Sequence, residues 1–183
     1  SALLVAGLSF ILCEAVLQLA ARMVPFVKYQ ISPPWSRNQV PDSGLGYRNS
    51  PFFPGHDRRG YRNDDALDRY DIVAIGDSTT YGFGVAPESS WPRQLRTLSG
   101  RTVYNGGVAG YGPCEYERVA DELLALNPEL VIVGLNLTND IADAYRSVVL
   151  ERRCPNLMTT APATLAAMRE ADDQARLREL LAQ

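Results

Sequence analysis

Short apolar segments alternate with amphipathic ones through the middle of the chain. Residues 72–75, 101–105 and 129–137 carry apolar or β-branched side chains over lengths that predict strands. The stretch 91–98, which is followed by Gly100, predicts a helix. A second helix is predicted over 115–126, with one apolar face made by Tyr116, Val119, Leu123 and Leu126. The order βαβαβ implies a parallel sheet with right-handed crossovers.

Each predicted strand leads into a polar or glycine-rich segment. Residues 76–79 (GDST) follow the first strand, 105–112 (NGGVAGYG) the second, and 137–140 (LTND) end the third. The carboxyl ends of parallel strands share one edge of the sheet, and ligands bind at that edge. Ser78 stands directly after a Gly-Asp pair at this edge, which suggests a catalytic nucleophile.

These three segments resemble, in order and spacing, the first three sequence blocks of the SGNH or GDSL-type hydrolases. The resemblance covers residues 40–145, including upstream stretches found in membrane-anchored bacterial members. It implies a three-layer α/β/α, flavodoxin-like fold with Ser78 as the nucleophile. It also implies that the Gly110 N–H and the Asn139 side-chain amide bind the oxyanion. Leu137 stands where the third block usually has glycine.

The general base of the family is a histidine in a D-x-x-H motif near the C-terminus, and this sequence has no such motif. The one histidine, His56, precedes Ser78 in a segment rich in proline and arginine, where we expect a surface residue. A serine hydroxyl is a weak nucleophile until a base takes its proton. We therefore interpret the chain as a fragment, incomplete at the C-terminus of its hydrolase domain, and expect it to be nearly inactive alone.

Several of these residues have alternative interpretations. Ser78 could cap a helix, and Asn139 could be an ordinary loop residue. Three glycines, Gly106, Gly107 and Gly112, are expected to be turn residues with positive φ. The two acidic residues of the blocks, Asp77 and Asp140, are expected to brace loops by accepting backbone N–H groups.

Other chemistry is excluded by particular residues. The turn GDSTTYGFG has no lysine for a P-loop, no third glycine for a dinucleotide fingerprint, and Thr80 where an α/β-hydrolase elbow has glycine. One histidine and three dispersed cysteines make no metal cluster, so we expect neither a metal nor an organic cofactor. A net charge of −3 argues against a nucleic-acid partner, and 46% hydrophobic residues exclude a disordered chain.

The N-terminal stretch 1–21 has a single charge, Glu14, and as a helix would span roughly 30 Å, about one bilayer core. It predicts a membrane anchor, with a cleaved signal peptide as the alternative. We divide the chain into this anchor or signal segment (1–24), a connecting segment (25–69) and the N-terminal part of the hydrolase domain (70–183). Prolines make the connecting segment non-helical, and its aromatic residues indicate that it packs on the domain.

Cys114 and Cys154 could pair in an exported domain, or both could be free thiols. The resemblance implies a single-pass protein of the cell membrane with its catalytic domain outside the cytoplasm. The expected activity is hydrolysis of an acyl ester, an O-acetyl ester of a small molecule or carbohydrate, through an acyl-serine intermediate. The alternatives are a cell-envelope O-acyltransferase that uses the same serine, and a catalytically silent domain that binds a glycan or a partner protein.

Overall fold

The computed structural model describes residues 2–24, 38–64 and 67–181. The chain forms two compact units, Ser1–Gly60 and Tyr61–Gln183, and each is described by itself. The division of the sequence at residues 24 and 69 stays a prediction.

The first unit begins with a helix, α1 (Ala2–Met23). Two polar side chains lie in its middle, where Gln18 Nε2 donates a hydrogen bond to Glu14 Oε1 at 2.8 Å. Within the part of the chain that the structure describes, no helix is both long enough and apolar enough to cross a bilayer. The membrane anchor predicted over residues 1–24 is therefore not supported, and the Glu14–Gln18 pair interrupts the apolar run on which that prediction rested.

A hairpin that the sequence pattern did not predict follows in the same unit. Strands β1 (Gln39–Asp42) and β2 (Gly46–Asn49) pair antiparallel, with Asp42 opposite Gly46. The Asp42 carboxylate closes the turn by accepting hydrogen bonds from the N–H groups of Gly44 (2.9 Å) and Leu45 (2.8 Å). Residues 25–37 of the predicted connecting segment lie outside the described residues.

His56 also belongs to the first unit, where it is half-buried rather than a fully exposed surface residue. Its Nδ1 lies 2.8 Å from the Ser50 carbonyl oxygen, and its ring centroid is 4.9 Å from that of Phe53. These contacts give the ring a local structural role.

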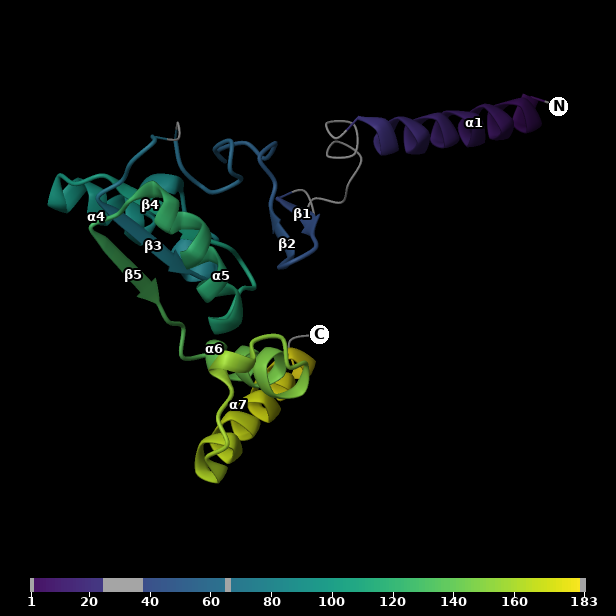
Figure 1. Cartoon of the computed structure of the whole chain (residues 1–183). Coiled ribbons are helices and arrows are strands. Elements are labelled where there is room, and N and C mark those ends of the chain that lie inside the picture. The colour runs from purple at the N-terminus through teal and green to yellow at the C-terminus, as the bar shows by residue number, and fades with distance from the viewer. Residues whose placement is uncertain (1, 25–37, 65–66, 182–183) are drawn as a thin grey trace. The chain divides into compact units, whose positions relative to one another are not determined.

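The second unit contains the predicted parallel sheet. Its strands are β3 (Ile72–Gly76), β4 (Val103–Gly107) and β5 (Leu130–Gly134), in the order β4-β3-β5 (Figure 1). Ile72 pairs with Val103 on one side and with Leu130 on the other, so the three strands are in register. The predicted βαβαβ order is confirmed, with strand boundaries shifted by a few residues.

Helices cover both faces of this sheet. Trp91 and Leu95 of α4 (Trp91–Ser99) pack against Ile72, Ala74 and Val103 on one face. On the other face lies α5 (Pro113–Leu123), which a short 3₁₀ turn, Leu124–Leu126, extends (Figure 1). Its predicted apolar face is confirmed, because four side chains are at most 4% exposed: Tyr116, Val119, Leu123 and Leu126. This arrangement of helix, parallel sheet and helix fits the predicted three-layer fold.

The remaining helices of this unit are shorter or lie toward the C-terminus. They are α3 (Ser78–Tyr81), α6 (Asp140–Ala144), which continues as a π-helix over Tyr145–Leu150, and α7 (Pro162–Leu181). Two residues with positive φ end helical segments: Gly100 (φ 67°) ends α4, and Asn127 (φ 50°) ends the turn after α5.

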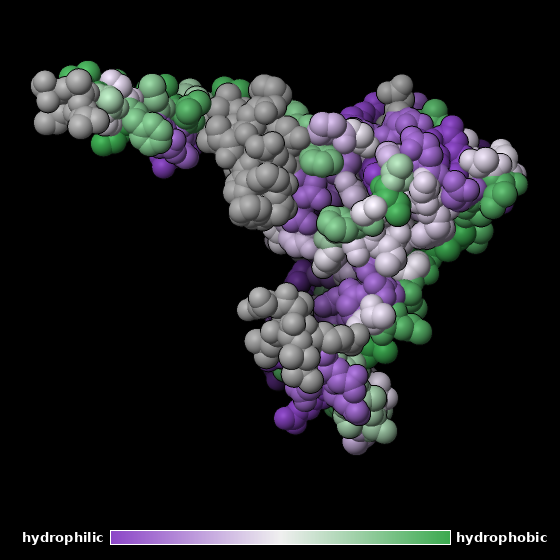
Figure 2. All heavy atoms as spheres, turned by 180° about the vertical axis from the view of Figure 1, so that it is seen from behind, coloured by the Kyte–Doolittle hydropathy of each residue, from purple (hydrophilic) through white to green (hydrophobic). Residues whose placement is uncertain are grey.

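Burial differs between the two outer strands. All residues of β3 and β4 are buried, whereas Leu130 and Val133 of β5 are about half-exposed. Leu135 and Leu137, which follow β5, are more exposed still. Figure 2 shows this apolar surface along one edge of the unit. The edge of β4 is covered instead by Asn63, whose side chain bonds both the N–H (2.8 Å) and the carbonyl (3.1 Å) of Asn105. Asn63 therefore packs on this edge of the sheet. The packing of the predicted connecting segment as a whole stays a prediction.

Three glycines stand in one row where the strands end. Gly76 pairs with Gly107 and with Gly134, and a Cβ at any of them would come closer than 3 Å to residue 80 or 81 of α3. The row therefore lets the single turn of α3 lie directly on the ends of the strands.

The prediction that Gly106, Gly107 and Gly112 are turn residues with positive φ is wrong. Gly106 and Gly107 belong to β4 and Gly112 begins α5, and none of the three has positive φ. A Cβ would collide with Leu123 at Gly106 and with Asp143 at Gly112. Close packing, and not a left-handed backbone, is what requires glycine there.

Candidate active site

Ser78 is the first residue of α3, directly beyond the end of β3. Asp77 caps this helix by accepting hydrogen bonds from the Thr79 N–H (2.8 Å) and hydroxyl (2.7 Å), and Gly82 (φ 81°) ends it. The cap is therefore Asp77, so the alternative in which Ser78 serves as the helix cap is wrong. The Ser78 side chain is half-buried, and its hydroxyl has no hydrogen-bond partner among the residues that the structure describes.

Arg62 holds the turn after Ser78 in place. Its guanidinium donates hydrogen bonds to the carbonyls of Tyr81 (3.2 Å), Gly82 (2.5 Å) and Val85 (2.8 Å), and it lies over the Tyr81 ring, 5.1 Å from the centroid. These three charge-assisted bonds to carbonyls of residues 81–85 fix the backbone just beyond Ser78.

Asp77 joins the first polar segment to the third. Its carboxylate is fully buried and accepts a hydrogen bond from Asn136 Nδ2 at 2.9 Å, across 59 residues of sequence. Burial acts to raise the pKa of Asp77, but hydrogen bonds from Thr79, Asn136 and Asn139 outweigh it and hold the pKa below its usual value. The prediction that Asp77 braces a loop is confirmed, and the group stays ionised at neutral pH.

Replacement of Asp77 by asparagine should destabilise the protein at neutral pH and have little effect in acid. Because the folded-state pKa of Asp77 is lowered, its stabilisation is present above the unfolded value of 3.8 and is lost as the pH falls through the folded value. At neutral pH we expect a loss of about 1–3 kcal/mol, since the Asn136 amide loses its anionic acceptor. Urea unfolding of both proteins across the acid range measures this loss. A penalty that does not shrink in acid would contradict it.

Gly110 lies at the tip of the loop between β4 and α5. It is exposed and has φ 84°, a conformation that favours glycine. Below the tip, the Val108 N–H donates to the Gly76 carbonyl (3.0 Å), and the Tyr111 side chain is buried. The Gly110 N–H has no hydrogen-bond partner within the described ranges.

Asn139 begins α6 and holds its amide beside two carboxylates. Nδ2 donates a hydrogen bond to Asp143 Oδ2 at 3.0 Å, and the amide also contributes to lowering the pKa of Asp77. Its Oδ1 is buried and unpaired within the described part of the chain. The amide is therefore fixed near the residue that precedes Ser78, and Asp77 links the two segments.

Asp140 and Asp143 belong to α6, just after Asn139 in the sequence. Burial raises the pKa of both, and the nearby Asp77 charge adds to the effect. Asp140 accepts hydrogen bonds from the Asn136 N–H (2.8 Å) and the Tyr116 hydroxyl (3.0 Å). The prediction that Asp140 braces a loop is confirmed, and its partner Tyr116 ties α5 to α6.

Comparison with known families shows which family the chain belongs to. A model described as the GDSL-like Lipase/Acylhydrolase family matches residues 74–183, which include all three polar segments. The chain belongs to this family. No curated protein and no solved structure matches it significantly. Membership of an acylhydrolase family indicates ester hydrolysis in general.

Sequence reasoning missed three residues of this GDSL-like site. Asn136, Asp143 and Glu115 hold the loops through the bonds to Asp77, Asn139 and Gly112. For two of these residues, the spacing in the sequence could have indicated the contact. Asp143 follows Asn139 by four residues, which are neighbours on a helix, and Glu115 follows Gly112 by three, as in a capping box.

The described residues of this GDSL-like chain offer no base to Ser78, and they contain no group of His, Cys, Asp or Glu that could hold a metal ion. A pocket of about 220 Å³ lies elsewhere in the unit, between residues 62–64 and 67–70, α4 and β4. None of Ser78, Gly110 and Asn139 lines it, so it does not belong to the predicted nucleophile site.

Proposed function

We propose that this chain carries the nucleophile and the oxyanion-binding groups of a serine esterase. Its substrate would be an acyl ester, an O-acetyl ester of a small molecule or carbohydrate. One observation carries the proposal: the unpaired Ser78 hydroxyl stands beside Asp77, whose carboxylate binds the segment that presents Asn139. The second donor, the Gly110 N–H, is exposed and unpaired in the described structure.

In the proposed reaction the Ser78 oxygen attacks the carbonyl carbon of the ester. The carbonyl oxygen becomes negatively charged and accepts hydrogen bonds from the Gly110 N–H and Asn139 Nδ2. The bond to the alcohol then breaks, the alcohol leaves with a proton, and the acyl group stays on Ser78. Water releases it in a second, equivalent step. A base must accept the Ser78 proton in the first step, and no described residue forms a hydrogen bond with that hydroxyl.

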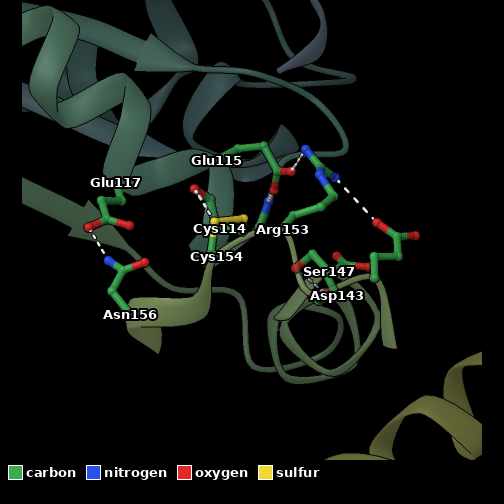
Figure 3. Close-up of a disulfide and its surroundings, with 10 residues drawn as sticks. Cys114, Glu115, Glu117, Asp143, Ser147, Arg153, Cys154 and Asn156 are labelled. Carbon is green, nitrogen blue, oxygen red and sulfur yellow. Dashed lines mark hydrogen bonds and ion pairs between the residues drawn. A yellow bond between two sulfur atoms is a disulfide. The ribbon is translucent and has the colours of Figure 1, made fainter. Parts of the chain in front are cut away.

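We further propose that the domain works outside the cytoplasm. Cys114 and Cys154, which the sequence left either paired or free, form a disulfide with a Cα–Cα distance of 5.7 Å (Figure 3). This bond supports the proposal, because structural disulfides persist in oxidising compartments and are rare elsewhere.

The nucleophile is tested by covalent labelling. The full-length protein is treated with an alkyl fluorophosphonate, digested, and mapped by mass spectrometry. We expect the label on Ser78 and none on Ser89, an exposed serine eleven residues later. Incubation with an aryl acetate, with and without a sugar acceptor, then separates the products. Free acetate supports the esterase, acetylated sugar replaces it with the acyltransferase, and absence of both label and turnover favours the silent binding domain.

A further inference from the structure

Glu115, in the first turn of α5, makes two bonds in different directions from one buried carboxylate. Oε2 accepts a hydrogen bond from the Gly112 N–H at 3.1 Å, and Oε1 lies 2.6 Å from Nη2 of Arg153. The Glu115 side chain is 9% exposed. Figure 3 shows the guanidinium of Arg153 facing this carboxylate. One oxygen of Glu115 thus forms an ion pair with Arg153, and the other binds a backbone N–H of the loop that carries Gly110.

Arg153 is itself fixed to the same helix. The next residue, Cys154, is bridged to Cys114, which directly precedes Glu115. The Arg153 N–H also donates to the Ser147 carbonyl at 2.9 Å. The ion pair and the disulfide therefore form two adjacent links between the start of α5 and the segment around residue 153 (Figure 3).

Gly112 is confined from its other side as well. A Cβ on this residue would lie 2.9 Å from the Cβ of Asp143, the residue that holds the Asn139 amide. The C-terminal end of the Gly110 loop is thus held between a carboxylate on α5 and a side chain on α6. Of these two contacts, the bond from Glu115 is the one that fixes a backbone N–H.

We propose that Glu115 is a positioning residue of the esterase, which holds the loop so that the Gly110 N–H points at the developing oxyanion. This inference rests on the proposed function. The Glu115 carboxylate bonds Gly112 and Arg153 and not Ser78, so the residue acts through Gly112. Since an oxyanion donor acts mainly in the transition state, its loss of position lowers kcat more than it changes KM. A displacement of about 1 Å can cost about a hundredfold in rate.

The test compares Glu115→Ala, Glu115→Gln and Glu117→Ala in the full-length protein with an aryl acetate as substrate. Glu117 is the matched control, because it lies on the same helix but is exposed and bonds Asn156, away from the loop. We expect Glu115→Ala to lower kcat by about ten- to a hundredfold with KM within about twofold. Glutamine still offers an oxygen to the Gly112 N–H and should recover most of kcat, and Glu117→Ala should match the wild type.

Hydrogen exchange gives a second readout that does not depend on turnover. In Glu115→Ala, the amides of residues 108–112 should exchange faster than in the wild type, whereas those of β3 should not change. If Glu115→Ala fails to fold, Arg153→Met, which removes the charge partner, is measured in the same way. If these variants keep the wild-type kcat, or if their amides exchange at the wild-type rate, the inference about Glu115 is overturned and the proposed function is not affected. Absence of Ser78-dependent turnover in the wild type overturns the proposed function and the inference together.

Discussion

Replacement of Ser78 by alanine should reduce ester hydrolysis by the full-length protein by about ten-thousandfold or more and abolish fluorophosphonate labelling. The hydroxyl is the only group removed, and in the proposed reaction its oxygen forms the bond to the acyl group, so no other group can substitute for it. Loss of a single oxyanion donor in Asn139→Ala should be milder, about a hundred- to a thousandfold in kcat. Initial rates with an aryl acetate measure this ranking: we expect Ser78→Ala to be the slowest, Asn139→Ala to be intermediate and the wild type to be the fastest.

The control is Ser89→Ala, which makes the same chemical change at an exposed serine and should keep the wild-type rate. Circular dichroism of each variant checks that the fold is retained. Hydrolysis that survives in Ser78→Ala would remove Ser78 from the role of nucleophile. An Asn139→Ala variant with wild-type kcat would instead leave the nucleophile in place and remove Asn139 from the oxyanion site.

Replacement of Gly107 by alanine should cause the largest loss of stability among single methyl additions to the sheet, about 3 kcal/mol. A Cβ at this position overlaps the backbone nitrogen of Tyr81 and the carbonyl carbon of Thr80, which are main-chain atoms that cannot rotate away. Overpacking of a well-packed site costs about 1–3 kcal/mol, and a clash with backbone lies at the upper end. Urea denaturation followed by circular dichroism measures the change.

Gly7→Ala is the comparison for that substitution. Gly7 lies within α1, its φ is not positive, and a Cβ there meets nothing within 4 Å. Alanine at this position should be neutral or slightly stabilising, because it favours the helix. If Gly107→Ala were as stable as Gly7→Ala, the close contact between β4 and α3 would not be a constraint on the fold.

The sheet and its main helices could be predicted because their signals are local. Four apolar residues before Gly76, and the spacing of Tyr116, Val119 and Leu123, fix a strand and a helix face without knowledge of neighbours. The glycines were misread because a turn and a tight crossing both exclude a side chain. Only the tertiary structure, which places the Gly107 backbone against that of Tyr81 in α3, distinguishes the two.

The candidate site shows the same difference between local signals and tertiary contacts. Ser78, Gly110 and Asn139 are predicted by their order and spacing, which the sequence records directly, and their catalytic roles stay predictions. Their supports depend on tertiary contacts, such as the bond between Asn136 and Asp77 across 59 residues. The hairpin β1–β2 was missed because the prolines of that region indicated irregular structure, whereas Pro41 is accommodated in a strand whose turn Asp42 closes.

The disulfide also has a consequence for producing the protein. Cys13 is a free, exposed thiol, so three cysteines allow three intramolecular pairs during oxidative refolding, of which one is native. A thiolate exchanges with any disulfide sulfur that it can reach. In the folded protein Cys114 and Cys154 are 1% and 3% exposed and are shielded from this attack, but in the unfolded chain they are not. A Cys13→Ser background leaves one intramolecular pairing and removes the exposed thiol through which folded molecules could form disulfide-linked dimers.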